Sequence, residues 1–142
     1  ASRGLGDVYK RQLSAKRDIL MVKDRVSMSD HQLVIVPELF IDQPVNLAAI
    51  LTMTYSVILE LIQEQTTVRL LYWSTNRYEY EDVRIDYKEE LDAAFARLYY
   101  EKAYKNPSEA ADHMALVYPE MHAYLHVFSD GQGAQMQVRE NE

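Results

Sequence analysis

The chain of 142 residues is long enough for one domain with a buried core. Its 15 Lys and Arg residues against 22 Asp and Glu residues give a formal net charge of −7, which argues against a protein that binds nucleic acid through its phosphates. The sequence contains no cysteine, which excludes disulfides and thiolate metal sites and fits a cytoplasmic domain.

Residues 1–12 differ in kind from the rest of the chain. The stretch Asp7–Gln12 reads Asp-Val-Tyr-Lys-Arg-Gln, which matches the translation of a transposase adapter used in DNA library preparation. We therefore expect residues 1–12 to be a non-native scar, rather than a natural basic arm, with no part in the fold. On this interpretation the gene was cut just before Leu13, natural N-terminal sequence is missing, and residues 13–142 form a single domain.

The pattern of apolar residues predicts two strands, a long helix and a third strand. Asp18–Lys23 and Leu33–Val36 are short apolar runs, and the second is typical of a strand buried on both faces. A helix is expected over Pro44–Gln65 and a strand over Val68–Trp73. A strand, a long crossover helix and a strand form a parallel unit, so we expect an α/β domain with its function at the carboxyl ends of the strands.

The central helix is unusually apolar. Gln43–Leu59 contains no charge over 17 residues. A membrane span needs about 20 predominantly apolar residues, and the polar side chains of Thr52, Ser56 and Glu60 form a stripe at helical spacing. These features favour a buried core helix with one solvent edge over the alternative of a transmembrane helix.

The second half of the chain predicts further elements in alternation. Tyr78–Ile85 alternates tyrosine with charge, which indicates an antiparallel edge strand, and Tyr87–Lys102 is an amphipathic helix. A helix from Asn106 to Val117, a strand over Ala123–Phe128 and a short strand over Gln135–Val138 follow. The expected fold is a three-layer, Rossmann-like α/β domain with a mostly parallel sheet and helices on both faces.

Several catalytic motifs are absent from the sequence. Outside residues 1–12 the only glycines are Gly131 and Gly133, so no glycine-rich phosphate loop follows the first strands, and no cofactor is expected. No Gly-x-Ser-x-Gly elbow is present. His122 and His126 are four residues apart, but on a predicted strand they lack the helical geometry of a zinc protease motif, and no Glu follows His122. We expect ordinary histidines and no catalytic residue.

The stretch Leu13–Asp24, Leu-Ser-Ala-Lys-Arg-Asp-Ile-Leu-Met-Val-Lys-Asp, resembles a segment of the bacterial family called domain of unknown function fifty-eight. The order of predicted elements as far as Asp130 resembles that family too. The resemblance implies a fold similar to the von Willebrand factor A domain. It also implies a membrane-anchored parent with this domain on the cytoplasmic side, its N-terminal anchor missing here, and a MoxR-type AAA+ ATPase as partner.

The same resemblance implies a place where a metal ion would bind. In the wider fold the motif Asp-x-Ser-x-Ser follows the first core strand, whereas here Glu38–Asp42 reads Glu-Leu-Phe-Ile-Asp and offers no serine. Asp130 and Gly131 resemble a later Asp-Gly corner of that site. One carboxylate cannot supply the oxygen ligands of a divalent cation, so we expect no functional metal site.

These observations predict a non-catalytic protein-interaction domain that works through loops at the strand ends. The expected binding residues are Glu38, Asp42, Ser74, Thr75, Asn76, Asp130 and Gly131. A tyrosine-rich partner surface around Tyr78, Tyr80, Tyr99 and Tyr100 is a further hypothesis, against ordinary packing of these rings. The alternative function is an α/β enzyme that uses carboxylates in the same crevice, with or without a metal ion.

Overall fold

The computed structural model describes residues 32–39, 44–101, 114, 116–119, 121, 123–129 and 131–140. Residues 1–12 and the strand predicted at Asp18–Lys23 lie outside the described residues. The elements are β1 (Gln32–Pro37), α2 (Pro44–Gln63), β2 (Thr67–Ser74), β3 (Glu79–Ile85), α3 (Lys88–Leu98), β4 (Ala123–Ser129) and β5 (Ala134–Glu140).

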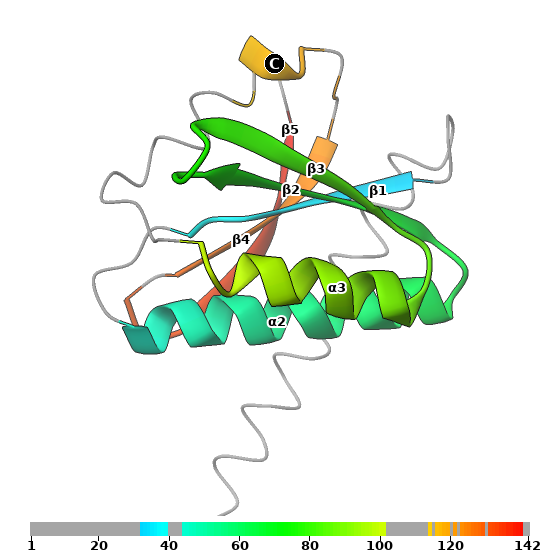
Figure 1. Ribbon diagram of the computed structural model, residues 1–142, viewed down its shortest axis with the longest axis horizontal. Helices are drawn as coiled ribbons and strands as arrows, with labels where there is room; N and C mark the ends of the chain where they lie inside the picture. The colour runs from blue at the N-terminus through cyan, green and yellow to red at the C-terminus, as the bar shows by residue number, and fades with distance from the viewer. Residues whose placement is uncertain are drawn as a thin grey trace, which may run out of the picture.

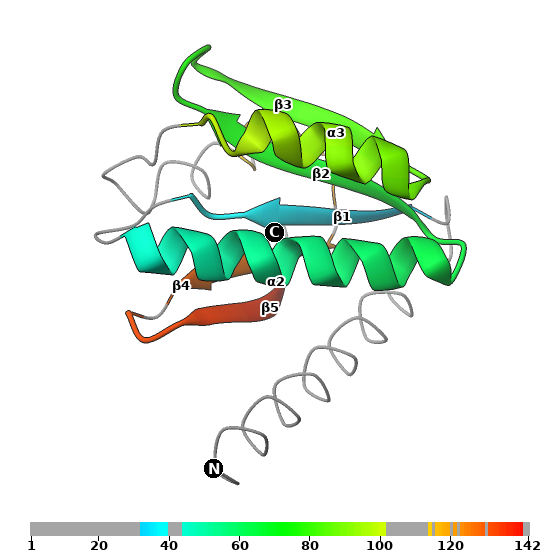
Figure 2. The same cartoon turned by 60° about the horizontal axis from the view of Figure 1, so that its bottom comes forward.

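The described strands form one five-stranded sheet in the order β3-β2-β1-β4-β5 (Figure 2). β1 pairs in parallel with β2 on one side and with β4 on the other, so the predicted parallel unit of strand, long crossover helix and strand is confirmed for β1, α2 and β2. Both edge strands are antiparallel, β3 to β2 as predicted and β5 to β4. The sheet is therefore parallel at its centre and antiparallel at its edges, because short hairpins connect each outer pair.

Both α2 and α3 cover the same face of the sheet (Figures 1 and 2). The main core lies between them and the sheet, and it includes Leu51 and Ile58 of α2, as expected for a buried core helix. Ile62 of the same helix is only partly buried at the margin of this core. None of the helices in the described part of the chain combines the length and the apolar content that crossing a bilayer requires.

The central helix ends two residues earlier than the sequence predicts. Gln65 has a φ of 64°, in the left-handed region. Its N–H donates to the carbonyl of Ile62, and the N–H of Thr66 donates to the carbonyl of Leu61. This pair of bonds is a Schellman motif, which usually carries glycine at the left-handed position. With glutamine there, the sequence offers no sign of the stop after Gln63.

The inward face of α3 follows its amphipathic pattern. Leu91, Ala94, Phe95 and Leu98 are all buried. The helix is tied to α2 by Tyr55, whose hydroxyl donates to Asp92 at 2.7 Å and whose ring contacts Phe95 edge to face. This contact fixes where α3 ends, at the carboxyl edge of the sheet.

A second, smaller core lies on the opposite face of the sheet. Val34, Val36 and Leu71 point there and pack with Met114, Met121 and Tyr124. The segment that includes residues 114 and 116–119 covers this face, at the top of Figure 1, and Met114, Leu116 and Val117 are helical. The predicted helix over 106–117 therefore has its described end on the face opposite α2, and the rest of it lies outside the described residues.

Candidate functional site

The carboxyl ends of β1, β2 and β4 lie at one edge of the sheet because the three strands are parallel. Glu38 follows β1, Ser74 ends β2 with Thr75 and Asn76 after it, and Gly131 follows β4. The predicted site residues Asp42 and Asp130 lie outside the described residues. Glu38, Ser74 and Asn76 belong to two polar clusters that differ in their access to solvent, whereas Thr75 and Gly131 do not line the cavity described below.

The first cluster is a buried pair, Glu38 with His126. The Nε2 atom of His126 lies 3.0 Å from Oε2 of Glu38, and each side chain is only 6% exposed. The backbone N–H of Glu38 also donates to the carbonyl of Val127 at 2.7 Å. Since β1 and β4 pair with Val36 opposite His126, this register carries Glu38 to the imidazole. We call Glu38 and His126 the closed pair.

Aromatic rings enclose His126 on its own strand. Its ring stacks on Phe128, with centroids 5.2 Å apart, and meets the ring of Tyr124 edge to face. The Nδ1 atom is shut off from solvent and has no hydrogen-bond partner among the described residues. A general base needs a nitrogen within reach of a substrate proton, so the imidazole is not placed to act as one.

The loop after β1 does not fit a divalent cation where the structure describes it. The carboxylate of Glu38 is already bonded to His126, and the neighbouring Leu39 is an apolar side chain with 2% exposure. Within the described ranges, no group of three or more His, Asp or Glu residues could hold a metal ion. Mg²⁺ and Ca²⁺ need several oxygen ligands, and this segment supplies one occupied carboxylate.

The second cluster is built on the hairpin between β2 and β3. The turn is Thr75–Tyr78, and the N–H of Tyr78 donates to the carbonyl of Ser74 at 2.8 Å. Tyr78 has a φ of 54°, a left-handed conformation that closes the turn. The hydroxyl of the buried Ser74 accepts a bond from the N–H of Arg77 and donates to Glu101 at 2.9 Å. Ser74 therefore holds the turn against the end of α3.

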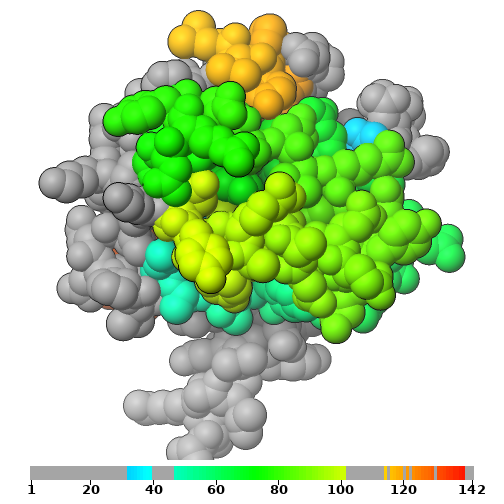
Figure 3. Space-filling model, in the orientation of Figure 1, coloured from blue at the N-terminus to red at the C-terminus, as the bar shows by residue number. Residues whose placement is uncertain are grey.

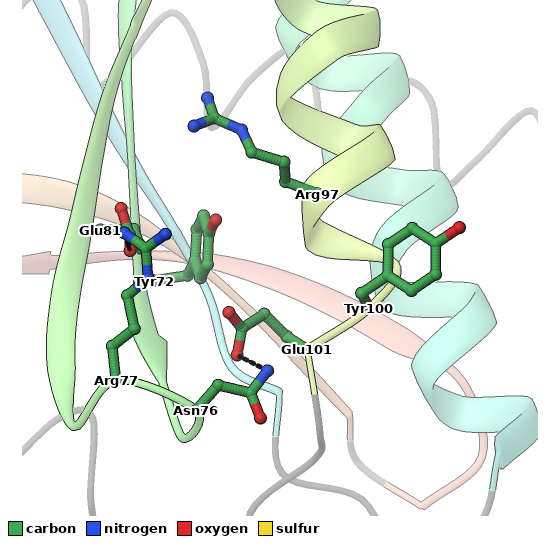
Figure 4. A pocket seen from close by; sticks show the side chains of 7 residues that line it. All are labelled: Tyr72, Asn76, Arg77, Glu81, Arg97, Tyr100 and Glu101. Atoms are coloured by element: carbon green, nitrogen blue, oxygen red, sulfur yellow. Dashed lines mark hydrogen bonds and ion pairs between the residues drawn. The ribbon is translucent and has the colours of Figure 1, made fainter.

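A cavity of about 220 Å³ opens between this hairpin and the end of α3. The two segments lie side by side on one face of the molecule, the turn in green and the helix end in yellow in Figure 3. We call the cavity the hairpin pocket. The side chains that line it, drawn in Figure 4, are Tyr72, Asn76, Arg77, Glu81, Arg97, Tyr100 and Glu101.

In the described part of the chain, three of the four charged side chains that line the hairpin pocket, all except Arg97, are bonded to neighbouring side chains. Arg77 contacts Glu81 at 3.0 Å, and Glu101 accepts bonds from Ser74 and, at 3.4 Å, from Asn76. These bonds hold the walls of the pocket in place. Ser74 and Asn76 were predicted as binding residues; of these, Asn76 faces the pocket and Ser74 positions its wall.

The hydroxyl of Tyr72 lies at the buried side of the pocket. Burial raises the pKa of this phenol, the nearby carboxylates of Glu81 and Glu101 raise it further, and Arg97 and Arg77 lower it. The net direction is upward from the usual value of 10.0, so the hydroxyl keeps its proton at neutral pH. Sequence analysis missed Tyr72 and Arg97, since the first looks like a core residue of β2 and the second like a solvated residue of α3.

Three of the four tyrosines in the predicted surface are exposed at this edge. Tyr78 is 81% exposed, Tyr99 64% and Tyr100 84%. Tyr80 instead contacts the rings of Trp73 and Tyr118 and is half-buried against the smaller core. Of these exposed tyrosines, Tyr100 lines the hairpin pocket, Tyr78 lies in the turn that also carries Arg77, and the ring of Tyr99 contacts Phe95 edge to face.

Comparison with known proteins adds no relative to this picture. No protein-family model, no curated protein and no solved structure matches the chain.

Proposed function

We propose that this chain is a von Willebrand A-like protein-interaction domain that binds a protein partner through the loops at the carboxyl edge of its sheet, without a metal ion. The observation that carries the proposal is the set of three exposed tyrosines on the β2–β3 turn and at the end of α3, Tyr78, Tyr99 and Tyr100, of which Tyr100 lines the hairpin pocket. Tyrosine is enriched in the residues that dominate binding energy at protein interfaces, because a large rigid ring is buried at little entropic cost.

The support extends to the scaffold beneath these rings. The turn that carries Tyr78 is closed by backbone and Ser74 bonds, and Tyr99 and Tyr100 follow directly on a helix packed into the core. Residues held in place before binding lose less conformational entropy when a partner covers them. The surface has the features of a rigid docking platform.

A carboxylate-based enzyme is the alternative, and the closed pair is the observation in its favour. An acid beside a histidine at the strand ends is a common arrangement in catalysis. Against it, both side chains are only 6% exposed, and Nδ1 of His126 is enclosed without a hydrogen-bond partner among the described residues. Ser74, the hydroxyl of the other cluster, is bonded on both sides. Binding accounts for both clusters better than catalysis does.

The wider context of the proposal rests on the resemblance of Leu13–Asp24 and of the element order to domain of unknown function fifty-eight. On that basis the parent protein is anchored in the bacterial membrane, this domain lies on the cytoplasmic side, and the partner is a MoxR-type AAA+ ATPase. Metal-independent binding is proposed because Glu38 is already bonded to His126 and the residue after it is apolar.

The test is to measure binding of the purified chain to a MoxR-type AAA+ ATPase by biolayer interferometry, with EDTA and with Mg²⁺. We expect the Tyr100→Ser variant to bind at least about tenfold more weakly, which is the loss of one moderate hot spot. Tyr87→Ser is the matched control, since Tyr87 is 67% exposed at the other end of α3. Binding that needs Mg²⁺, or that both variants weaken equally, would contradict the proposal.

A further inference from the structure

Two hydrogen-bond donors in the hairpin pocket have no partner in the part of the chain that the structure describes. Tyr72 is 3% exposed, and its hydroxyl, which faces the pocket, makes no hydrogen bond there. Arg97 lines the same pocket and makes no ion pair or hydrogen bond with a described residue. In Figure 4 the guanidinium of Arg97 reaches from α3 toward the strand that carries Tyr72. The ring of Tyr72 is buried while its side chain lines the open pocket, so both donors are accessible to a ligand.

The other charges of the pocket leave Arg97 as the unmatched one. Arg77 and Glu81 form an ion pair at 3.0 Å, and Glu101 is bonded to the hydroxyl of Ser74 and the amide of Asn76. An incoming anion would meet two free donors. An incoming cation would have to compete with Arg77 for Glu81 and would face Arg97. The unmatched groups therefore select an acceptor with negative charge.

The size of the pocket limits the ligand. Its volume is about 220 Å³. Pockets for whole small molecules usually run from about 300 to 1,000 Å³, so this one suits a single side chain. A carboxylate matches the donors, since a guanidinium binds its two oxygens in parallel and a hydroxyl can donate to one of them.

We propose that the hairpin pocket binds the carboxylate of an Asp or Glu side chain on a protein partner, held by the guanidinium of Arg97 and the hydroxyl of Tyr72. The identity of the ligand as part of a protein rests on the proposed function, because the exposed Tyr100 lines the same pocket and Tyr78 lies in the turn that forms one of its walls. The raised pKa of Tyr72 agrees with this role, since the phenol stays protonated and able to donate. Arg97 and Tyr72 thus set specificity, and the tyrosines supply contact area.

The test uses small probes and needs no partner. N-acetyl-glutamate N-methylamide, its glutamine and lysine analogues, and free acetate are titrated into the ¹⁵N-labelled chain and followed by NMR at residues 74–78 and 97–101. We expect saturable shifts with the glutamate probe in the range of about 1–10 mM, as for one isolated side chain. The glutamine probe should not saturate, and acetate should bind more weakly than the glutamate probe.

Variants locate the effect at the two donors. Arg97→Gln should weaken binding of the glutamate probe at least about tenfold, as expected for loss of a charge-assisted bidentate contact. Tyr72→Phe keeps the ring in the core and removes only the hydroxyl, so we expect a loss of about two- to tenfold. Arg84→Gln is the control, because Arg84 is exposed on β3 and pairs with Asp86 outside the pocket.

Four results would overturn the proposal: stronger saturation by the lysine probe, no saturation by the glutamate probe up to about 50 mM, acetate binding as tightly as the glutamate probe, or unchanged binding in Arg97→Gln. The outcome is independent of the ATPase experiment. If the glutamate probe fails while the ATPase still binds, the pocket proposal fails and the proposed function stands. If the probe binds while no ATPase does, the pocket is a carboxylate site and the proposed function fails.

Discussion

The closed pair and the hairpin pocket are both polar clusters at the carboxyl edge of the sheet, and they differ in depth. Glu38 follows β1, the middle strand of the sheet, and His126 lies on the neighbouring β4; their side chains are bonded to each other, while Nδ1 of His126 has no hydrogen-bond partner among the described residues. The hairpin pocket lies toward the edge formed by β2 and β3, and it leaves Arg97 and the Tyr72 hydroxyl unmatched. A charged side chain that is buried needs a bonded partner within the fold, because burial without one is costly. A charged side chain in contact with solvent does not need such a partner and can bind a ligand instead.

Each cluster also contains a tyrosine with a raised pKa. Burial raises the pKa of Tyr124 beside the closed pair, Glu38 raises it further, and Arg139 lowers it. Burial likewise raises the pKa of Tyr72 in the hairpin pocket. The pKa of both phenols is raised, and burial is the main cause for each. Because only Tyr72 lines the hairpin pocket, a ligand bound there should change the pKa of Tyr72 and leave that of Tyr124 unchanged.

The largest effect is expected from breaking the closed pair. His126→Ala leaves the carboxylate of Glu38 buried without its imidazole, and removing one partner of a buried ion pair costs about 3–5 kcal/mol of unfolding free energy. Urea denaturation followed by circular dichroism measures this loss.

A double variant shows whether the pair is structural. Glu38→Met with His126→Phe replaces both partners by apolar groups of similar volume, which is often close to neutral. We expect the double variant to be more stable than His126→Ala alone. If His126→Ala costs less than about 1 kcal/mol, the pair is not sealed as described and the comparison with the open pocket loses its basis.

The next largest loss of unfolding free energy is expected from the apolar core. It serves as the reference for a substitution in the interior that removes no charged group. Ile58 is fully buried on α2, and Ile58→Ala should cost about 2–5 kcal/mol through lost burial and the cavity left behind. Ser56→Ala on the exposed side of the same helix is the control, expected within about 0.5 kcal/mol of the wild type. A loss below half a kilocalorie for Ile58→Ala, by the same denaturation assay, would place the helix at the periphery.

A smaller loss of stability is expected at Ser74, the residue that bonds the β2–β3 turn to the end of α3. Ser74 is fully buried, donates to Glu101 and accepts from the N–H of Arg77, so Ser74→Ala should cost about 1–3 kcal/mol. Asn76→Ala removes only an exposed bond of 3.4 Å and should cost less than about 0.5 kcal/mol. Equal losses in thermal unfolding would mean that Ser74 does not hold the turn.

The elements of the fold were largely predictable from local patterns. The β-branched run of β1, the long apolar run of α2 and the amphipathic face of α3 each indicate which side chains are buried from a short window of sequence. The end of α2 was not predictable, because Gln65 takes a left-handed conformation that sequence rules assign to glycine.

The site was predictable only in part, because its contacts join residues far apart in the chain. Glu38 and His126 are 88 residues apart, and only the register of β1 against β4 brings them together. Arg97 reaches the pocket because α3 returns to the carboxyl edge beside the hairpin. Periodicity shows which face of an element is buried, but it does not show which neighbour that face meets.

The smallest expected effect is the pH dependence of stability that Tyr72 and Tyr124 contribute, and it allows the two residues to be compared. A phenol whose pKa is higher in the folded chain than the unfolded value of 10.0 favours the neutral form, so its contribution to stability is present below pH 10.0 and is lost as the pH rises through the folded pKa. Tyr72→Phe should therefore lose less stability than the wild type between about pH 9 and pH 11, and Tyr124→Phe should behave likewise. Denaturation at the two pH values measures both.

A bound carboxylate then separates the open cluster from the closed one. Negative charge beside the Tyr72 hydroxyl, and a hydrogen bond to it, both disfavour the phenolate, so the glutamate probe should raise the pKa of Tyr72 further. Tyr124 lies in the other cluster, beside His126, and its pKa should not move. Phenolate absorbance near 295 nm, compared among the wild type, Tyr72→Phe and Tyr124→Phe with and without the probe, assigns each transition. A shift of both tyrosines, or of Tyr124 alone, would show that the two clusters are not distinguished by access to ligand.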